Sequence, residues 1–235
     1  ETRRAKACLL ELEDGNERCQ RRFWDFLDEI PNGLRIVEKA SALGNGLFED
    51  IEDDLQEHPG TELYVIDTFA AIRPKEAEYS YQGDYSDWRS IADFATEHGV
   101  CIVVVHHCRK AVDLLDPFSN ISGTSGTTGG VTGMIVLQKD YNNPGTTFMF
   151  CNGKDIQEST YRIKKSDSEW KMLEELDPET VAKLALPDCI LQTVSWMDGI
   201  GESGREALRP CSSRWELRTS AFPLTESTLR STATQ

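Results

Sequence analysis

Two short apolar runs stand out in the pattern of hydrophobic and polar positions. Residues 63–66 (LYVI) lead into Asp67 and Thr68, and residues 101–105 (CIVVV) lead into His106 and His107. Runs rich in β-branched residues are typical of strands that are buried on both faces of a parallel sheet. The helical pattern of residues 84–98 is long enough to make the crossover between two such strands. The pattern therefore predicts an α/β domain.

The remaining elements follow the same alternation. In chain order the pattern predicts a strand at 6–13, a helix at 17–30, a short strand at 34–37 and a helix at 47–56. Alternating strands and helices of this kind predict right-handed crossovers and a layered fold with a mainly parallel central sheet. Later runs at 134–138, 146–151 and 160–164 are separated by turn-forming residues and predict an antiparallel extension at the sheet edge.

The C-terminal part differs in character. Residues 177–197 have a helical pattern that Pro187 interrupts. From about Ser203 onward the chain has a local charge of +2, whereas the remainder sums to −17, and the amphipathic period is lost. We expect a core at 1–165, a helical segment at 166–202, and a tail at 203–235 that is either disordered or not native, for example through a reading-frame change.

Composition sets outer limits on the function. A length of 235 residues, with 39% hydrophobic and 28% charged residues, fits one large globular domain. No apolar run approaches the length of a membrane span, and the N-terminus has no secretion signal. Seven scattered cysteines suit a reducing cytoplasm. The net charge of −15 argues against binding nucleic acid through the whole surface, but not against a basic channel in an oligomer.

Carboxylates at strand ends are candidates for nucleotide chemistry. Asp67, at the tip of an apolar strand, is placed where P-loop NTPases hold magnesium; the plainer interpretation is a turn-starting residue. Glu11 and Glu13 share one face of the first strand, and Glu13 lies at the carboxyl end of that strand. Glu13 could position an attacking water, or it could belong to a solvent-facing edge.

The two histidines point to opposite faces of their strand, so they cannot readily hold one metal together. We expect one of them to donate a hydrogen bond to a terminal phosphate and the other to be packed or exposed. Arg109 and Lys110 add positive charge suited to phosphate or to a neighbouring subunit. The glycine-rich stretch 119–133 contains no G-x-x-x-x-G-K-[ST] motif, and is either a flexible linker or a mobile contact loop.

Five motifs in order resemble the RecA-like P-loop ATPases, in particular the plasmid RepA-type hexameric replicative helicases and related mobile-element ATPases. They are LLELEDG (9–15), LYVIDT (63–68), VVVHHCRK (103–110), DPFSNISGTSGTTGGVTGMIVLQ (116–138) and CNGKDI (151–156). The resemblance implies Glu13 as the catalytic glutamate, and Asp67, followed by Thr68, as the Walker B aspartate that holds Mg²⁺ through water. It also implies His107 as the γ-phosphate sensor, with His106 the less favoured choice.

The resemblance further implies ATP and Mg²⁺ as cofactors, a hexameric ring, and single-stranded DNA near residues 111–130. Three departures qualify it. The strand, loop and helix that carry Walker A would precede residue 6 and are missing, Thr132 stands where relatives often have Asp, and Lys154 stands where they tend to have Arg. We expect a motor fragment that is inactive alone. The alternative is a non-catalytic nucleic-acid-binding or regulatory module with a decayed ATPase fold.

Overall fold

The computed structural model describes residues 4–25, 27–74, 80–110, 113–166 and 169–185, all within a compact unit that extends from Glu1 to Ala185. The predicted tail at 203–235, and the predicted helical residues from 186 onward, lie outside the described residues. Within the described ranges no helix is long and apolar enough to cross a membrane.

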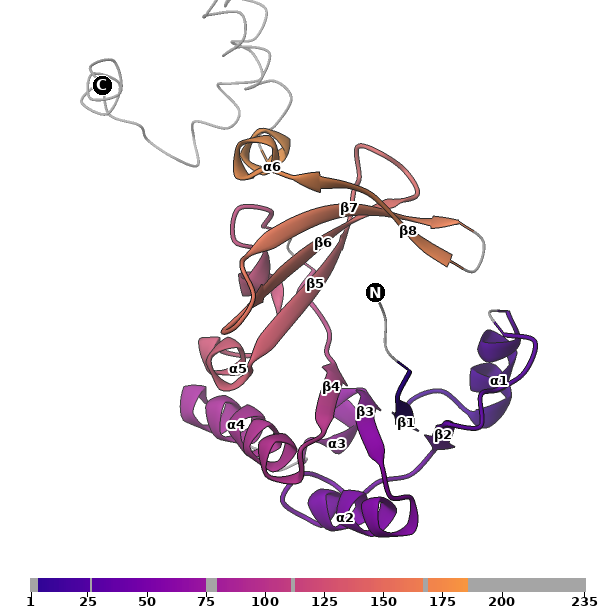
Figure 1. Ribbon diagram of the computed structural model, residues 1–235. Helices are drawn as coiled ribbons and strands as arrows, with labels where there is room; N and C mark the ends of the chain where they lie inside the picture. Colours follow the sequence, from indigo (N-terminus) through magenta and orange to yellow (C-terminus); the bar gives the residue numbers. More distant parts are fainter. Residues whose placement is uncertain (1–3, 26, 75–79, 111–112, 167–168, 186–235) are drawn as a thin grey trace, which may run out of the picture. The chain divides into compact units, whose positions relative to one another are not determined.

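A four-stranded parallel sheet forms the first part of the fold (Figure 1). Its strands lie in the order β2-β1-β3-β4, so the first strand of the chain pairs with both the second and the third. The bounds are β1 Lys6–Glu11, α1 Asn16–Trp24, β2 Leu34–Val37, α2 Leu47–Glu57, β3 Thr61–Asp67, α3 Phe69–Ile72, α4 Tyr81–His98 and β4 Cys101–Val105. The predicted α/β class with a parallel sheet is confirmed.

Helix bounds follow local chemistry. α1 ends at Trp24 rather than at residue 30, because Asp25, Asp28 and Glu29 would place negative charge at the negative end of the helix dipole. α4 begins one turn earlier than predicted, since Ser80 caps it by accepting a hydrogen bond from the Gly83 amide over 3.1 Å. α4 ends at His98, and Gly99 caps it with a φ of +65°, which suits glycine.

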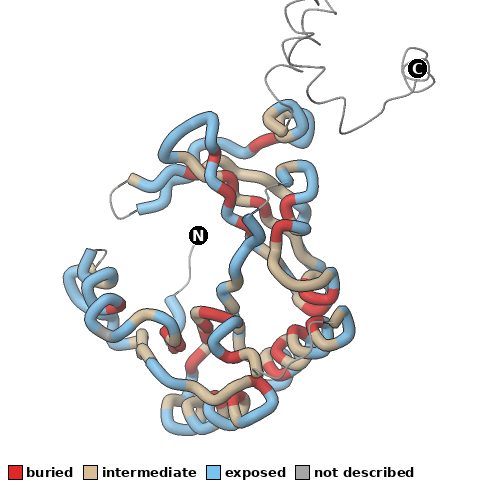
Figure 2. Tube along the Cα trace, turned by 180° about the vertical axis from the view of Figure 1, so that it is seen from behind, coloured by how far each residue is buried: buried red, intermediate tan, exposed pale blue. Residues whose placement is uncertain are grey.

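One face of the parallel sheet carries the main core. Cys8 and Leu10 of β1 lie level with Tyr64 and Ile66 of β3, and all four are buried. Because side chains alternate along a strand, these residues share a single face. Helices α2, α3 and α4 cover that face, and Figure 2 colours the buried stretches of the chain red. The residues that these helices contribute to the core are Leu47, Ile51, Phe69, Ile72, Trp88, Ile91 and Phe94.

The opposite face of β4 corrects the expectation that this strand is buried on both sides. Val103 is 47% exposed and Val105 is 39% exposed. β4 is also an edge strand, because it pairs only with β3. Within the described residues, this part of the sheet therefore has both an open edge and an apolar face that meets solvent.

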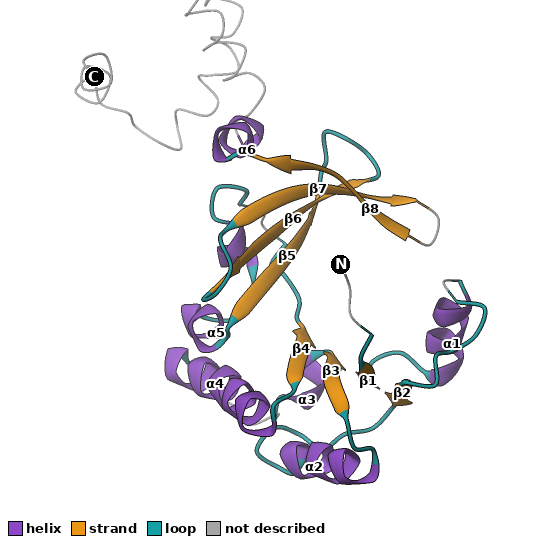
Figure 3. Ribbon diagram, in the orientation of Figure 1, coloured by secondary structure: helices purple, strands orange, loops and turns teal. Residues whose placement is uncertain are grey.

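The antiparallel strands form a sheet of their own, whereas we expected them to extend the parallel one (Figure 3). The order is β5-β6-β7-β8, with bounds β5 Gly133–Lys139, β6 Thr146–Gly153, β7 Ser159–Ser166 and β8 Glu169–Leu176. β8 occupies part of the segment expected to be helical, and the only described helix there is α6, Pro178–Ala185. Val136, Phe148, Phe150 and Leu176 form a second core, which Phe118, Val181 and Leu184 help to cover.

The glycine-rich stretch is more ordered than either sequence interpretation suggested. Pro117–Asn120 forms a 3₁₀ turn, and Ser125–Gly130 forms a short helix, α5, which packs against α4. A Cβ at Gly130 would lie 2.6 Å from the Cβ of Trp88, and one at Gly126 would lie 2.9 Å from the backbone nitrogen of Tyr85. These two glycines therefore permit the close helix contact.

Candidate functional site

The carboxyl ends of β1, β3 and β4 meet at one edge of the parallel sheet. Glu11 lies level with Asp67, and Asp67 lies level with Val105. The amide of Leu12 donates a hydrogen bond to the carbonyl of Asp67 over 2.9 Å, which extends this alignment beyond the end of β1. In parallel α/β sheets this edge is where ligands bind.

Glu13 is held beside the end of β3. The buried Thr68 hydroxyl donates a hydrogen bond to Glu13 Oε1 over 2.6 Å. His107 Nε2 lies 3.8 Å from the same oxygen, and the His107 side chain is 66% exposed. Three of the residues singled out in the sequence are thus brought together, and Glu13 and His107 remain open to solvent.

Asp67 sits in a negative environment. Burial raises the pKa of its carboxyl above the ordinary value, and the nearby carboxylates of Glu13 and Asp14 raise it further, against smaller opposing effects of Arg22 and His107. An extra positive charge at this place would relieve that repulsion. The carboxyl of Asp67 is therefore easier to protonate than an ordinary aspartic acid.

The neighbouring acidic residues are already engaged. Glu11 is buried, and its Oε1 accepts a hydrogen bond from the Asp14 amide over 3.2 Å. Asp14 in turn makes ion pairs with Arg18 at 2.9 Å and Arg22 at 2.6 Å, both from α1. Glu11 thus shapes the turn after β1, which leaves Glu13 and Asp67 as the more available carboxylates.

His106 is directed away from this group. Its ring lies against Phe69 and Trp88, with centroid distances of 5.3 and 5.7 Å, and its Nε2 lies 2.9 Å from the Ser122 carbonyl oxygen. Burial lowers the pKa of His106, which favours the neutral ring. His106 therefore joins the end of β4 to the segment before α5, and His107 is the histidine beside Glu13.

The basic residues are more dispersed. Arg109 donates through Nη2 to the Gly123 carbonyl over 2.5 Å and through its amide to the Asn120 carbonyl over 2.6 Å. Lys110 is exposed directly after it. Lys154 is exposed after β6, and its amide bonds to the Thr132 carbonyl over 2.9 Å. In the part of the chain that the structure describes, none of the three makes an ion pair with Glu13 or Asp67.

One buried acidic residue escaped the sequence analysis. Asp84 accepts hydrogen bonds from Arg73 Nη2 at 2.6 Å and from the Thr124 amide at 2.7 Å. Burial alone would raise the pKa of Asp84, but the bonds from Thr124 and Arg73 hold it below its ordinary value. In the sequence, Asp84 is recognisable only as an acidic residue in the first turn of a predicted helix. Exposed helices also carry acidic residues at that position, so the pattern does not indicate burial.

Comparisons with known proteins bear on the fold of the chain. Residues 1–113 match a family model described as an AAA domain. A solved structure whose title describes an ATPase domain has a TM-score of 0.59 and 14% identity, over 72% of this chain and 75% of that one. The RadB recombinase structure has a TM-score of 0.47 and 13% identity, over 72% and 80%. No curated protein matches the sequence. The chain shares its fold with this ATPase domain, in agreement with the RecA-like layered fold that its motifs predict.

Proposed function

We propose that this chain is the larger part of an ATP-hydrolysing motor domain. The observation that carries the proposal is the meeting of Glu13, Thr68, Asp67 and His107 at the carboxyl edge of the parallel sheet. Glu13 orients and activates the attacking water, while Thr68 fixes the position of its carboxylate. His107 donates a hydrogen bond to the terminal phosphate.

The donor set fits Mg²⁺ bound with a nucleotide. Among the described residues, no group of three or more His, Cys, Asp or Glu side chains could hold a metal ion. Magnesium in nucleotide sites instead relies on one or two carboxylates together with phosphates and water. Asp67 supplies such a carboxylate. Burial raises its pKa most, and the charges of Glu13 and Asp14 raise it further, a repulsion that a cation would offset. When bound, Mg²⁺ would neutralise charge that develops on the phosphates.

Two sheet edges with exposed apolar side chains support the proposal of an added strand that carries a phosphate-binding loop. β4 and β5 are edge strands, and the apolar side chains of Val103, Val105, Ile135 and Leu137 are exposed on them. An added strand could pair with either edge, and a following helix could cover the open face. Glu11 and Asp67 point to the open face of the parallel sheet, since they alternate with the helix-covered residues. We therefore propose a Walker A strand, loop and helix there.

Action on single-stranded DNA within a homo-oligomeric ring is the finer part of the proposal. The net charge of −15 makes a shared, locally basic channel the reasonable way to bind phosphates. Arg109 and Lys110, at the end of β4, are the described cations closest in sequence to the proposed sensor His107. We propose that they face phosphate or a neighbouring subunit.

The test begins with the coding DNA upstream of Glu1. An in-frame G-x-x-x-x-G-K-[ST] codon set would allow expression of the extended protein, which should hydrolyse ATP with Mg²⁺. In it Glu13→Gln should reduce turnover by at least about a hundredfold while nucleotide binding is kept. Glu97→Gln, an exposed change on α4, serves as the matched control. Full turnover in the Glu13→Gln protein would refute the catalytic role and favour the non-catalytic module.

A further inference from the structure

A pocket of about 620 Å³ lies beside the second core, far along the chain from the nucleotide site. This volume is in the range of sites that accept a large side chain or a small ligand. Its apolar wall is formed by residues from three places in the sequence: Leu114, Leu115, Pro117, Phe150, Leu176 and Val181. Leu115 is largely exposed, so part of this wall meets solvent.

The charged residues that the structure describes around the pocket all have one sign. Glu158, Glu175 and Asp177 line it, and no described cation does. Asp177 is committed to the start of α6, where its Oδ2 accepts the Thr180 hydroxyl over 2.7 Å. Glu158 and Glu175 are exposed. These carboxylates would repel nucleic-acid phosphates, so the pocket suits an apolar group that carries a positive charge.

The end of α1 presents such a group. Trp24 is 62% exposed, and Arg21 lies three residues before it, on the same side of the helix. Arg18 and Arg22 are paired with Asp14, whereas Arg21 makes no ion pair within the described residues. Tryptophan and arginine seated in apolar pockets are the side chains that most often dominate the energy of an interface.

We propose that this pocket receives the end of α1 from a second copy of the chain, with Trp24 on the apolar wall and Arg21 facing Glu158 and Glu175. The contact joins different surfaces of two copies, so it is heterologous and either closes a ring or continues as a filament. It deepens the ring assembly proposed above by naming a contact. It does not depend on ATP.

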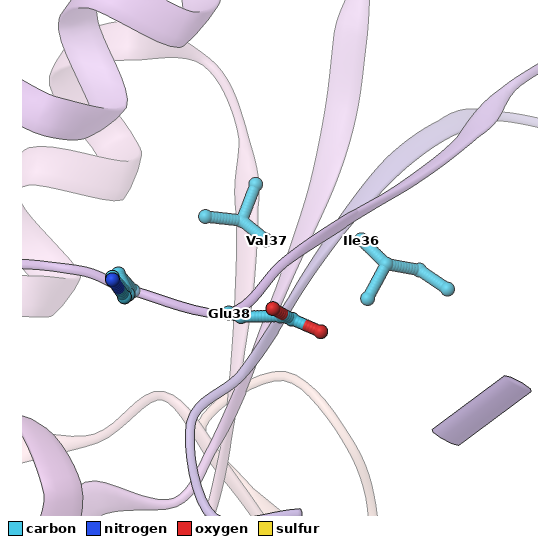
Figure 4. Close-up of a pocket in the computed structure, with 4 residues that line it drawn as sticks. Ile36, Val37 and Glu38 are labelled. Carbon is cyan, nitrogen blue, oxygen red and sulfur yellow. The ribbon is translucent and has the colours of Figure 1, made fainter. Parts of the chain in front are cut away.

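A second cavity of the described fold offers no comparable arrangement. It has a volume of about 370 Å³ and is lined by four consecutive residues, 36–39, at the end of β2 and just after it (Figure 4). Because one continuous stretch of chain forms its lining, no groups converge there from distant parts of the sequence.

Sedimentation velocity over a concentration series would test the contact with two variants. One carries Arg21→Glu and Trp24→Ala, and damages only the helix end. The other carries Glu158→Arg and Glu175→Arg, and damages only the pocket. The wild-type chain should self-associate, and each variant alone should do so at least about tenfold more weakly. All four positions are exposed, and circular dichroism would verify folding.

Mixing the two variants gives the decisive result. The first keeps an intact pocket and the second an intact α1, so together they should form a one-to-one dimer and nothing larger. Glu97→Arg, which makes one such substitution on the exposed side of α4, should associate like the wild type. A wild type that stays monomeric, variants that associate normally, or a mixture that stays monomeric would each overturn the proposal. Because no nucleotide is present, these outcomes leave the ATPase proposal to its own test.

Discussion

The Thr68 hydroxyl and the Glu13 carboxylate are 55 residues apart in sequence and form a hydrogen bond of 2.6 Å. The bond joins the residue after β3 to the turn after β1. It therefore fixes the proposed catalytic carboxylate relative to the proposed magnesium ligand, Asp67. The precision of the site depends on this side-chain contact as well as on the sheet.

Replacement of Thr68 tests that contact directly. Thr68→Val keeps the shape of the buried side chain but removes the donor, and should lower the free energy of unfolding by about 1 kcal/mol. The loss of stability is small because water can hydrogen-bond to the exposed Glu13 carboxylate in place of the Thr68 hydroxyl. Thr68→Ser retains the hydroxyl and serves as the control. Urea denaturation at pH 7 would measure both, and equal stability of the two variants would show that the bond contributes nothing.

The glycines of α5 provide a second prediction with an internal control. Gly126→Ala and Gly130→Ala should each destabilise the fold by about 1–3 kcal/mol, because the added methyl group meets the backbone of α4 or the Cβ of Trp88. At Gly129 a Cβ would be 3.5 Å from the Tyr85 ring, an ordinary contact. Gly129→Ala should be neutral or slightly stabilising. Similar thermal midpoints for all three variants would contradict the close packing.

Asp84→Asn should cost about 3 kcal/mol, since it removes the buried negative charge that lies 2.6 Å from Arg73 Nη2. The pH dependence has a definite sign. The pKa of Asp84 is lowered in the folded state, so the ionised carboxylate stabilises the fold. This stabilisation is complete above the ordinary carboxyl pKa, about 3.9, and is lost as the pH falls through the folded-state pKa. Acid unfolding curves should therefore differ between the wild type and the variant. Parallel curves would contradict this role.

Asp67→Asn should act in the opposite direction. The pKa of Asp67 is raised in the folded state, so its charge destabilises the fold at neutral pH, and the variant should have a slightly higher thermal midpoint there. The advantage should fade as the pH falls through the raised pKa, because the wild-type carboxyl then becomes protonated. Differential scanning calorimetry at several pH values, without added divalent cations, would detect it. A lower midpoint for the variant at pH 7 would refute the explanation.

The parallel sheet could be predicted because its signals are local. Residues 101–105 form β4 at the predicted bounds, and Asp67 ends β3 as expected. α5 was missed because SGTTGG is a poor helix sequence, and the contact with α4, which the sequence does not reveal, helps to stabilise it. β8 was missed because EWKMLEEL contains good helix formers, and pairing with β7 overrides that preference.

The candidate site was predictable only in part. Side-chain alternation correctly separated His106 from His107, but the choice of His106 as the packed residue depends on Phe69, Trp88 and Ser122. The bond from Thr68 to Glu13 and the role of Asp84 depend on side chains brought together from distant parts of the chain. Sequence patterns identify which residues lie at the carboxyl end of a strand, whereas tertiary packing decides which side chains those residues contact.

The strand order also affects how the chain folds during synthesis. β1 emerges from the ribosome before its neighbour β3, which begins only at Thr61. At about 5–20 residues per second, β1 remains without that neighbour for several seconds. The apolar residues of β1 can pair with β3 only after about 50 further residues have been synthesised, and contacts this distant in sequence slow folding. Slower translation before Thr61 would lengthen this interval, so codon choice in that region should affect the yield of soluble protein.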